Sequence, residues 1–269
     1  MYEITKLQAA LRHHLGWHGA RLSFLAAFLI ALLRVKSINF AELATAFGGK
    51  VQIDSHTKRL HGFCRDYKLN YAEIAPAVVG LMNIPEAGVL WLDRTQWQFG
   101  KCVFNILMLG VVHEGVAFAL VWCVLDKKGN SNVDERAELF NEFLFCFGNR
   151  RLVCLTADRE VVGKDWFSYL LGEPDTPFRI RIRANHKLND SRQSLRASVV
   201  FQDLQVGQTK LLKQPRWLWG HKLYIAALRL EDGELQIVAT QTRPDCAIAD
   251  YAQRWGIETL FGIFKTRGF

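Results

Sequence analysis

A long apolar stretch, residues 103–125, limits the folds that are open to this chain. His113-Glu114-Gly115 divides it in two, and the runs on both sides are rich in Val, Leu and Phe. A membrane-spanning helix needs about 20 apolar residues in a row, whereas two β-rich runs joined by a short turn are typical of a hairpin. The other apolar run, residues 22–33, is too short to span a bilayer. We therefore predict a β-hairpin inside a sheet and exclude a membrane protein.

The part of the chain before Pro85 has the apolar periodicity of helices. The first helix is marked by apolar side chains at helical spacing: Leu22, Leu25, Phe28, Leu29 and Leu32. A second helix is expected from Asn39, a suitable N-cap, to Phe47, where two glycines end it. A third is expected from about Asp54.

These second and third helices have the outline of a helix-turn-helix, whose second helix enters the major groove of DNA. The third carries four basic side chains: Lys58, Arg59, His61 and Arg65. A plain helical bundle with a basic solvated face fits the same pattern. Residues 1–85 are therefore expected to form a helical domain that binds DNA ends.

After Pro85 the pattern changes to strands alternating with helices, which predicts an α/β domain over residues 86–269. Strands are expected at 89–92, 102–112, 116–125, 151–157 and 178–183, and helices at 134–147 and 166–171. The alternation of Arg with apolar residues in 178–183 predicts a strand with one solvated face. Residues 184–242 are β-like and basic, and a last helix is expected from about Asp245 to Thr266.

The charge of the chain favours a polyanionic partner. The net charge is +8, and between Arg179 and Lys222 there are ten Lys or Arg against two Asp. Nucleic acid is the commonest polyanion, although charge alone also fits a basic solvated surface. The six cysteines are scattered without a paired spacing, so we expect neither a zinc site nor a disulfide framework. That usage fits a reducing cytoplasm.

Two aspartates occupy equivalent places in this pattern. Asp93 and Asp158 are each the polar residue at the end of an apolar strand, where α/β folds build their sites. If the two strands are neighbours, both carboxylates reach one edge of the sheet. Carboxylate and phosphate oxygens suit Mg²⁺, and two such ions about 3.5–4 Å apart can stabilise both oxygens of a phosphoryl transfer. Either residue could instead cap a turn.

The expected last helix places four functional groups on one stripe. At about 100° per residue, Tyr251, Arg254, Glu258 and Lys265 fall within an arc of roughly 60°. Glu258 would then bind a metal ion, while the two cations would hold phosphate oxygens. An ordinary solvated face with an Arg254–Glu258 pair has the same spacing.

At these residues the sequence resembles the DDE transposases of bacterial insertion sequences, in the insertion-sequence-four group. The Y-(2)-R-(3)-E-(6)-K signature of that group matches Tyr251, Arg254, Glu258 and Lys265 at every spacing. The first aspartate motif resembles Leu92-Asp93-Arg94-Thr95-Gln96-Trp97 followed by Phe99-Gly100. The second resembles Asp158-Arg159-Glu160 followed by Gly163.

The resemblance implies a ribonuclease-H-like core with a β-rich insertion at about 184–242. It implies that Asp93, Asp158 and Glu258 hold two Mg²⁺ ions, with Mn²⁺ able to substitute, and that Tyr251, Arg254 and Lys265 position phosphate. The enzyme would cut DNA at terminal inverted repeats and join the freed 3′-hydroxyl to target DNA. It also implies a homodimer on paired ends, a bacterial cytoplasmic location at the nucleoid, and a Trp of the insertion that stacks on a flipped base. Trp217 and Trp219 are the candidates, and either could be a core aromatic instead.

Members of that group usually continue past the signature helix, whereas this chain stops four residues after Lys265. An alternative expectation is therefore a truncated, inactive relative that binds transposon ends or intact transposase as an inhibitor. A third is a structure-specific nuclease with the same core, which would cut DNA without joining it.

Overall fold

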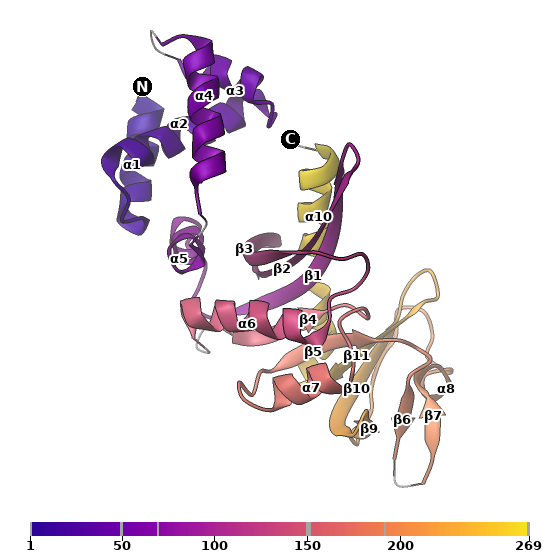
Figure 1. Ribbon diagram of the computed structural model, residues 1–269. Coiled ribbons are helices and arrows are strands. Elements are labelled where there is room, and N and C mark those ends of the chain that lie inside the picture. Colours follow the sequence, from indigo (N-terminus) through magenta and orange to yellow (C-terminus); the bar gives the residue numbers. More distant parts are fainter. Residues whose placement is uncertain (1, 49–50, 69, 149–151, 191, 268–269) are drawn as a thin grey trace. The chain divides into compact units, whose positions relative to one another are not determined.

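The computed structural model of the protein describes residues 2–48, 51–68, 70–148, 152–190 and 192–267 (Figure 1). The chain forms two compact units. The helical unit comprises Met1–Ile84 with Phe261–Phe269, and the sheet unit comprises Pro85–Leu260. Across the described ranges no single helix is long and apolar enough to cross a membrane, and Gly19–Val35 with Phe40–Ala46 passes that test only as a pair bent by 105°.

The helical unit is built from short capped helices. They are α1 (Tyr2–His14), α2 (Gly19–Val35), α3 (Phe40–Ala46), α4 (Ile53–Asp66) and α5 (Tyr71–Leu81). Side chains of His18, Asn39 and Asn70 accept hydrogen bonds from the first free amides of α2, α3 and α5, as N-caps do. The predicted N-cap at Asn39 is therefore confirmed.

Helices α2, α3 and α4 pack around one apolar cluster that contains Phe24, Leu43 and Leu60. The basic side chains predicted on the third helix lie on α4. Lys58, His61 and Arg65 are exposed there, and the Arg59 guanidinium lies 4.8 Å from the centre of the Phe24 ring. This exposed basic face is available to a polyanion, and its use in a DNA groove stays a prediction.

The sheet unit is centred on one large mixed sheet. Its first strands are β1 (Gly88–Phe99), β2 (Cys102–His113), β3 (Val116–Leu125), β4 (Leu152–Ala157) and β5 (Phe178–Ile182). They lie in the order β3-β2-β1-β4-β5, with β1 antiparallel to β2 and parallel to β4, and β4 parallel to β5. The class is therefore mixed α/β, as the sequence predicted.

The predicted hairpin is confirmed as β2 and β3, which pair from Asn105 opposite Leu125 to His113 opposite Val116. The turn residues Glu114 and Gly115 both have positive φ, as a tight hairpin turn requires. Within β2, Gly110 leaves room for the Trp91 ring, because a Cβ there would lie 2.6 Å from that ring.

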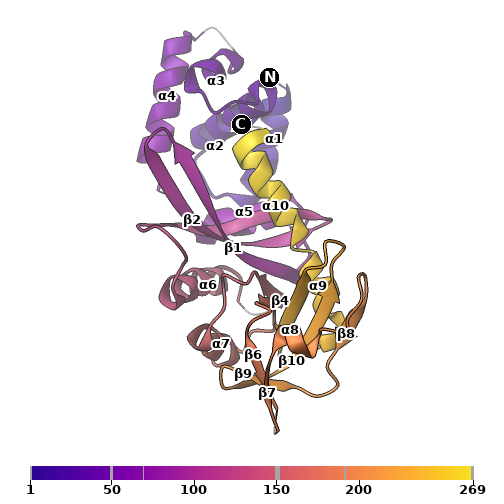
Figure 2. The same cartoon turned by 90° about the vertical axis from the view of Figure 1, so that its right-hand side faces the viewer.

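Helices cover both faces of the sheet. Helix α6 (Val133–Phe147) packs on β2 and β3, and α7 (Lys164–Leu171) lies beside α6. Helix α9 (Ala247–Ala252) packs against β4, β5, β10 and β11 from the opposite side (Figures 1 and 2). Helix α6 begins at a capping box in which the side chains of Asn132 and Glu135 bond each other's backbone amides.

The segment predicted to be β-rich continues the sheet on the other side of β5. It contains β6 (Lys187–Asn189), β7 (Ser194–Arg196), β8 (Thr209–Leu211), β9 (Arg216–Leu218), β10 (His221–Arg229) and β11 (Leu235–Thr240), with the short helix α8 (Ala197–Val200). Strand β11 joins it to the core by antiparallel pairing with β5. We call residues 184–242 the insertion.

The expectation that β5 has one solvated face is wrong. The side chains of Arg179 and Arg181 are only 1% and 14% exposed. Arg179 donates to Asp250 at 3.1 Å and to Thr240 at 2.7 Å, while Arg181 pairs with Glu234 at 2.9 Å. Buried arginines are tolerated here because acidic and polar partners from later parts of the chain meet them.

The predicted single last helix is also wrong. The chain forms η2 (Pro244–Cys246), α9, α10 (Trp255–Gly262) and the π-helical turn η3 (Ile263–Arg267), with a break at Gln253 and Arg254. Helix α10 packs at Gly256 against the β2–β3 turn, where a Cβ would lie 3.0 Å from the Gly115 carbonyl oxygen.

Candidate active site

Asp93 and Asp158 lie side by side at the end of a parallel strand pair. The last partners of β1 and β4 are Leu92 and Ala157, and the two aspartates follow directly. The sequence predicted that the first strand ends at Asp93, but β1 continues to Phe99 because its other edge pairs with β2, where Asp93 faces Met108. Only the pairing of β1 with β4 ends at this point, so both carboxylates lie at the end of that strand pair.

The chain near the α9–α10 break supplies partners for both carboxylates. The Tyr251 hydroxyl donates to Oδ1 of Asp158 at 3.2 Å. Nη2 of Arg254 donates to Oδ2 of Asp93 at 2.5 Å, and both side chains are largely covered, with 11% and 20% exposed. Residues from three distant motifs thus meet in one cluster: Asp93, Asp158, Tyr251 and Arg254.

Burial dominates the electrostatics of this cluster. It raises the pKa of Asp93 above its ordinary value, although Arg254 and the Arg94 amide oppose that rise, and the charges of Asp158 and Glu160 add to it. Burial also raises the pKa of Tyr251 to about 12, with a further contribution from Asp158. Tyr251 therefore keeps its proton at neutral pH and acts as a hydrogen-bond donor.

Burial of Arg254 works in the opposite direction to its acidic neighbours. Burial lowers the pKa of this guanidinium, but Asp93 first, and then Tyr251, Asp158 and Glu258, raise it to a net increase. Arg254 is therefore charged and serves as the counterion of the two aspartates. Its Nε is buried and has no hydrogen-bond partner among the residues that the structure describes.

A second cation approaches Asp158 from β5. Nη1 of Arg181 lies 3.9 Å from Oδ1 of Asp158, and its Nη2 lies 2.9 Å from Oε1 of Glu234 in the β10–β11 turn. Sequence reasoning missed both residues. The alternation of Arg in 178–183 was the available signal, but acidic partners from distant segments cannot be inferred from a local pattern.

Glu258 and Lys265 complete the predicted signature. Glu258 is exposed on α10, one helical turn after Arg254. Lys265 lies in η3 of the helical unit, 5.9 Å from the centre of the Phe261 ring. Within the part of the chain that the structure describes, no three Asp, Glu, His or Cys side chains gather as a metal site. The roles of Glu258 and Lys265 stay predictions.

The two aspartates nevertheless suit a magnesium ion. Mg²⁺ is usually bound by one or two carboxylates together with water and substrate phosphate oxygens, so a complete cage of protein ligands is not required. Asp93 and Asp158 supply such carboxylates at one sheet edge.

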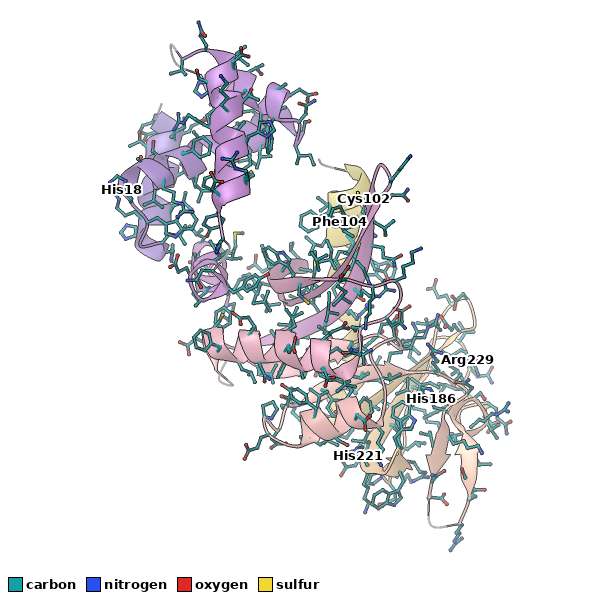
Figure 3. All side chains as sticks on the ribbon, viewed as in Figure 1. His18, Cys102, Phe104, His186, His221 and Arg229 are labelled. Carbon is teal, nitrogen blue, oxygen red and sulfur yellow. The ribbon has the colours of Figure 1, made fainter. Side chains whose placement is uncertain are left out.

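The two candidate stacking tryptophans have different surroundings. Trp217, on β9, is 48% exposed and pairs across the strands with Lys222. Trp219 has a positive φ and its ring packs edge-on against Phe167 at 5.2 Å and His186 at 4.7 Å; Figure 3 labels His186. Trp217 is thus the one with the exposed ring, whereas Trp219 packs against α7, and the stacking role of either stays a prediction.

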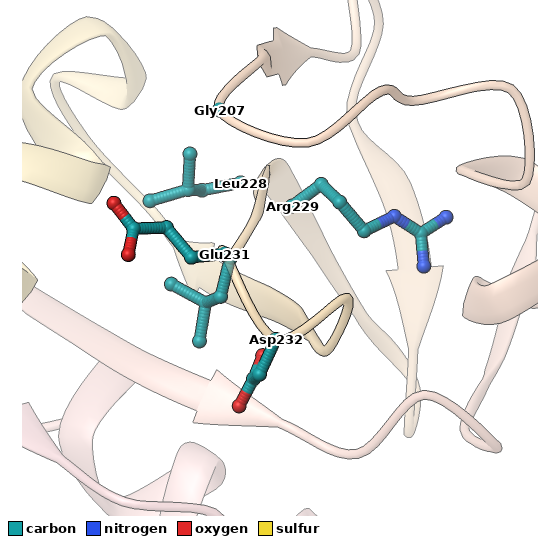
Figure 4. Close-up of a pocket in the computed structure, with 6 residues that line it drawn as sticks. Gly207, Leu228, Arg229, Glu231 and Asp232 are labelled. Carbon is teal, nitrogen blue, oxygen red and sulfur yellow. The ribbon is translucent and has the colours of Figure 1, made fainter.

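An open hollow of about 540 Å³ lies at the β10–β11 turn (Figure 4). Its lining includes Glu231, Asp232 and Arg229. The Arg229 guanidinium donates to backbone carbonyls on both sides of it, among them Leu204 and Gly233. This arginine therefore fastens the turn and is not a free anion-binding group.

Comparison with known proteins gives a distant structural likeness. No protein-family model matches the chain, and no curated protein matches it. Ten chains of solved structures match. One is the piggyBac transposase in a synaptic complex with hairpin DNA, which is 12% identical with a TM-score of 0.49. The match covers 91% of this chain and 60% of that one.

Proposed function

We propose that this chain is a DDE-type DNA transposase of the insertion-sequence-four group, which cuts DNA at transposon ends and joins the freed 3′-hydroxyl to target DNA. One observation carries the proposal. Asp93, Asp158, Tyr251 and Arg254 come from the three motifs of the resemblance, and in the structure they form one hydrogen-bonded and ion-paired cluster. The motifs lie up to 161 residues apart, so local sequence does not account for their meeting.

The topology around the cluster supports a ribonuclease-H-like core. We assign that core to β3-β2-β1-β4-β5, with α6 and α7 on one face and α9 on the other. The first aspartate then lies on the central strand β1 and the second follows its parallel neighbour β4. The insertion separates the second aspartate from Tyr251, which agrees with the β-rich insertion of the proposed group.

In the proposed reaction Asp93 and Asp158 would hold Mg²⁺, with Glu258 as the third carboxylate. The bound ions supply charge stabilisation for the attacking and leaving oxygens of the phosphoryl transfer. Tyr251 keeps its proton and orients Asp158 through their hydrogen bond. The planar guanidinium of Arg254 suits a phosphate oxygen pair, and Lys265 adds a point charge.

The remaining surface would bind the DNA. The insertion carries the exposed cations Lys187, Lys210, Lys213 and Lys222. It also carries the exposed ring of Trp217, which pairs across the strands with Lys222 and which we propose stacks on an unpaired base. The basic face of α4 would contact the terminal inverted repeat. Two copies on paired ends, in the bacterial cytoplasm, complete the proposal.

The test uses a supercoiled plasmid that carries the DNA segments flanking the gene. The purified chain is incubated with this plasmid and Mg²⁺, beside the Asp158→Ala variant as a matched control. Excision and joining by the parent alone would support the proposal. Cutting without joined products would favour a nuclease, and shifted but uncut DNA would favour a binding protein. If the parent protein neither binds nor cuts the plasmid, the proposal is refuted.

A further inference from the structure

The loop that carries Asp158 is not held by the sheet. The parallel pairing of β1 and β4 ends at Leu92 and Ala157, so Asp158 and the next residues continue beyond the last ladder contact. The position of the Asp158 carboxylate relative to Asp93 must therefore depend on side chains. The motif residues Arg159 and Glu160, which the proposed chemistry does not use, make those contacts.

Glu160 is bound by Arg94, the neighbour of Asp93 on β1. Nη2 of Arg94 donates to Oε2 of Glu160 at 3.2 Å, and the Arg94 side chain is 16% exposed. The same guanidinium donates to Oδ1 of Asn105 at 3.0 Å and to Oδ1 of Asn130 at 3.3 Å. Asn105 in turn donates to the carbonyls of Lys127 and Gly129, which fixes the loop that presents Asn130.

This network lies on the opposite face of the sheet from the proposed site. Successive side chains of a strand point to opposite faces. Asp93 points toward Arg254, whereas Arg94 points to the side that α6 covers. There Arg136 of α6 also donates to the Glu160 carbonyl, at 3.2 Å. The backbone and the side chain of Glu160 thus both accept hydrogen bonds on the face of the sheet that α6 covers.

Arg159, which lies between Asp158 and Glu160, is hydrogen-bonded to the insertion. Nη1 of Arg159 donates to Oε1 of Glu234 at 2.7 Å, and that carboxylate also pairs with Arg181. Val161 follows Glu160, is buried, and donates to the Asp158 carbonyl at 2.8 Å, which closes a tight turn. Asp158 is therefore the one acidic side chain of this turn that faces Tyr251, while its neighbours act as anchors.

We propose that Arg94 is a positioning residue: through Glu160 it holds the Asp158 loop so that Asp158 and Asp93 can bind one divalent ion. The inference rests on the proposed function of these aspartates. Arg94 contacts neither the ion nor the DNA in this scheme, and it reaches the Asp158 loop through Glu160. Mg²⁺ demands near-ideal octahedral geometry, which makes its affinity sensitive to such anchoring. Loss of an outer-shell partner typically lowers metal affinity about 10–100-fold.

The experiment measures Mn²⁺ binding to the whole chain without DNA, from the loss of the free-ion signal in electron paramagnetic resonance. The variants are Arg94→Ala, Arg94→Lys and Glu160→Gln, with Arg34→Ala as the control. Arg34 forms an exposed pair with Glu3 in the helical unit. We expect Arg94→Ala to weaken Mn²⁺ binding at least about tenfold, Arg94→Lys to retain most of it, and the control to bind as the parent does. Thermal unfolding of each variant is recorded alongside.

The outcomes separate the inference from the proposed function. If the parent binds no Mn²⁺, the proposed metal site is refuted and the inference falls with it. If the parent binds and a folded Arg94→Ala binds equally well, the inference alone is refuted. If Arg94→Ala does not fold, Glu160→Gln decides, because it keeps the shape of the side chain and removes the charge that Arg94 holds. Unchanged binding by Glu160→Gln would then overturn the inference.

Discussion

Nη2 of Arg254 lies 2.5 Å from Oδ2 of Asp93, and this ion pair connects the break between α9 and α10 to the central strand β1. The guanidinium neutralises the carboxylate that we propose as a metal ligand. Arg254 and a divalent ion would therefore compete for Asp93, and the arginine becomes available to phosphate when it leaves that carboxylate. The first prediction follows from this competition.

Arg254→Ala should bind Mn²⁺ more tightly than the parent, because the competing cation is gone. It should nevertheless cleave DNA about 10²–10³-fold more slowly, which is the usual effect of removing one charge-stabilising donor. Mn²⁺ titration and plasmid cleavage measure the two effects separately. Arg254→Lys is the matched control, since it keeps the charge without the planar pair of donors. Weaker Mn²⁺ binding by a folded Arg254→Ala would contradict the competition.

Tyr251→Phe should lower the free energy of unfolding by about 0.5–1.5 kcal/mol, the usual contribution of one hydrogen bond. It should also slow cleavage about tenfold, because Asp158 loses the donor that orients it. The pKa of Tyr251 is raised to about 12, so this hydroxyl is not a proton acceptor at ordinary pH. The cleavage rates of parent and variant should therefore stay parallel up to about pH 10. A divergence that begins near neutral pH would show that Tyr251 titrates in the reaction.

The raised pKa of Asp93 predicts a specific pH dependence of stability. A carboxyl whose pKa is higher in the folded than in the unfolded state takes up a proton on folding as the pH falls. The contribution of Asp93 to the free energy of unfolding is therefore least favourable above its folded-state pKa, and it improves as the pH falls. A salt-bridged carboxylate with a lowered pKa behaves in the reverse way. Asp93→Asn lacks this titration. Urea unfolding from about pH 7 to about pH 4 should show the parent gaining free energy of unfolding relative to Asp93→Asn.

Mn²⁺ binding should respond to acid in the opposite way, because a protonated carboxyl is a poor ligand. Binding should fall as Asp93 is protonated, at a higher pH than an exposed Asp would require. Asp165, in the first turn of α7, is exposed, and Asp165→Asn is the control. A binding midpoint in the ordinary Asp range for the parent would be inconsistent with the buried carboxyl as ligand.

The two tryptophans of the insertion should separate stability from DNA binding. Trp217→Ala should leave the free energy of unfolding within about 0.5 kcal/mol of the parent and weaken single-stranded DNA binding by about 1–3 kcal/mol. Trp219→Ala should lose about 2 kcal/mol of stability, below the value for a fully buried aromatic, because its contacts to Phe167 and His186 are removed. Chemical unfolding and fluorescence anisotropy check both. The reverse pattern would assign base stacking to Trp219.

Much of the fold could be predicted from local pattern. The β2–β3 hairpin follows from two apolar runs around a turn with positive φ, and α3 from its N-cap Asn39, since both signals act within a few residues. The aspartates could be placed after β-like runs for the same reason. The resemblance put Tyr251 and Arg254 in the same site, but local pattern could not show which aspartate each one contacts, because these pairs lie 93 and 161 residues apart in the chain.

What the sequence alone determined is therefore the order of the elements and the residue types of the three motifs. Tertiary structure decided the rest. It buries Arg179 and Arg181 in ion pairs and breaks the last helix at Arg254. It also pairs Arg94 with Glu160 on the face of the sheet that α6 covers. The ion pairs among these join residues far apart in the chain. Such contacts depend on the relative placement of strands and helices, which packing sets over the whole unit, whereas propensities and caps act within single turns.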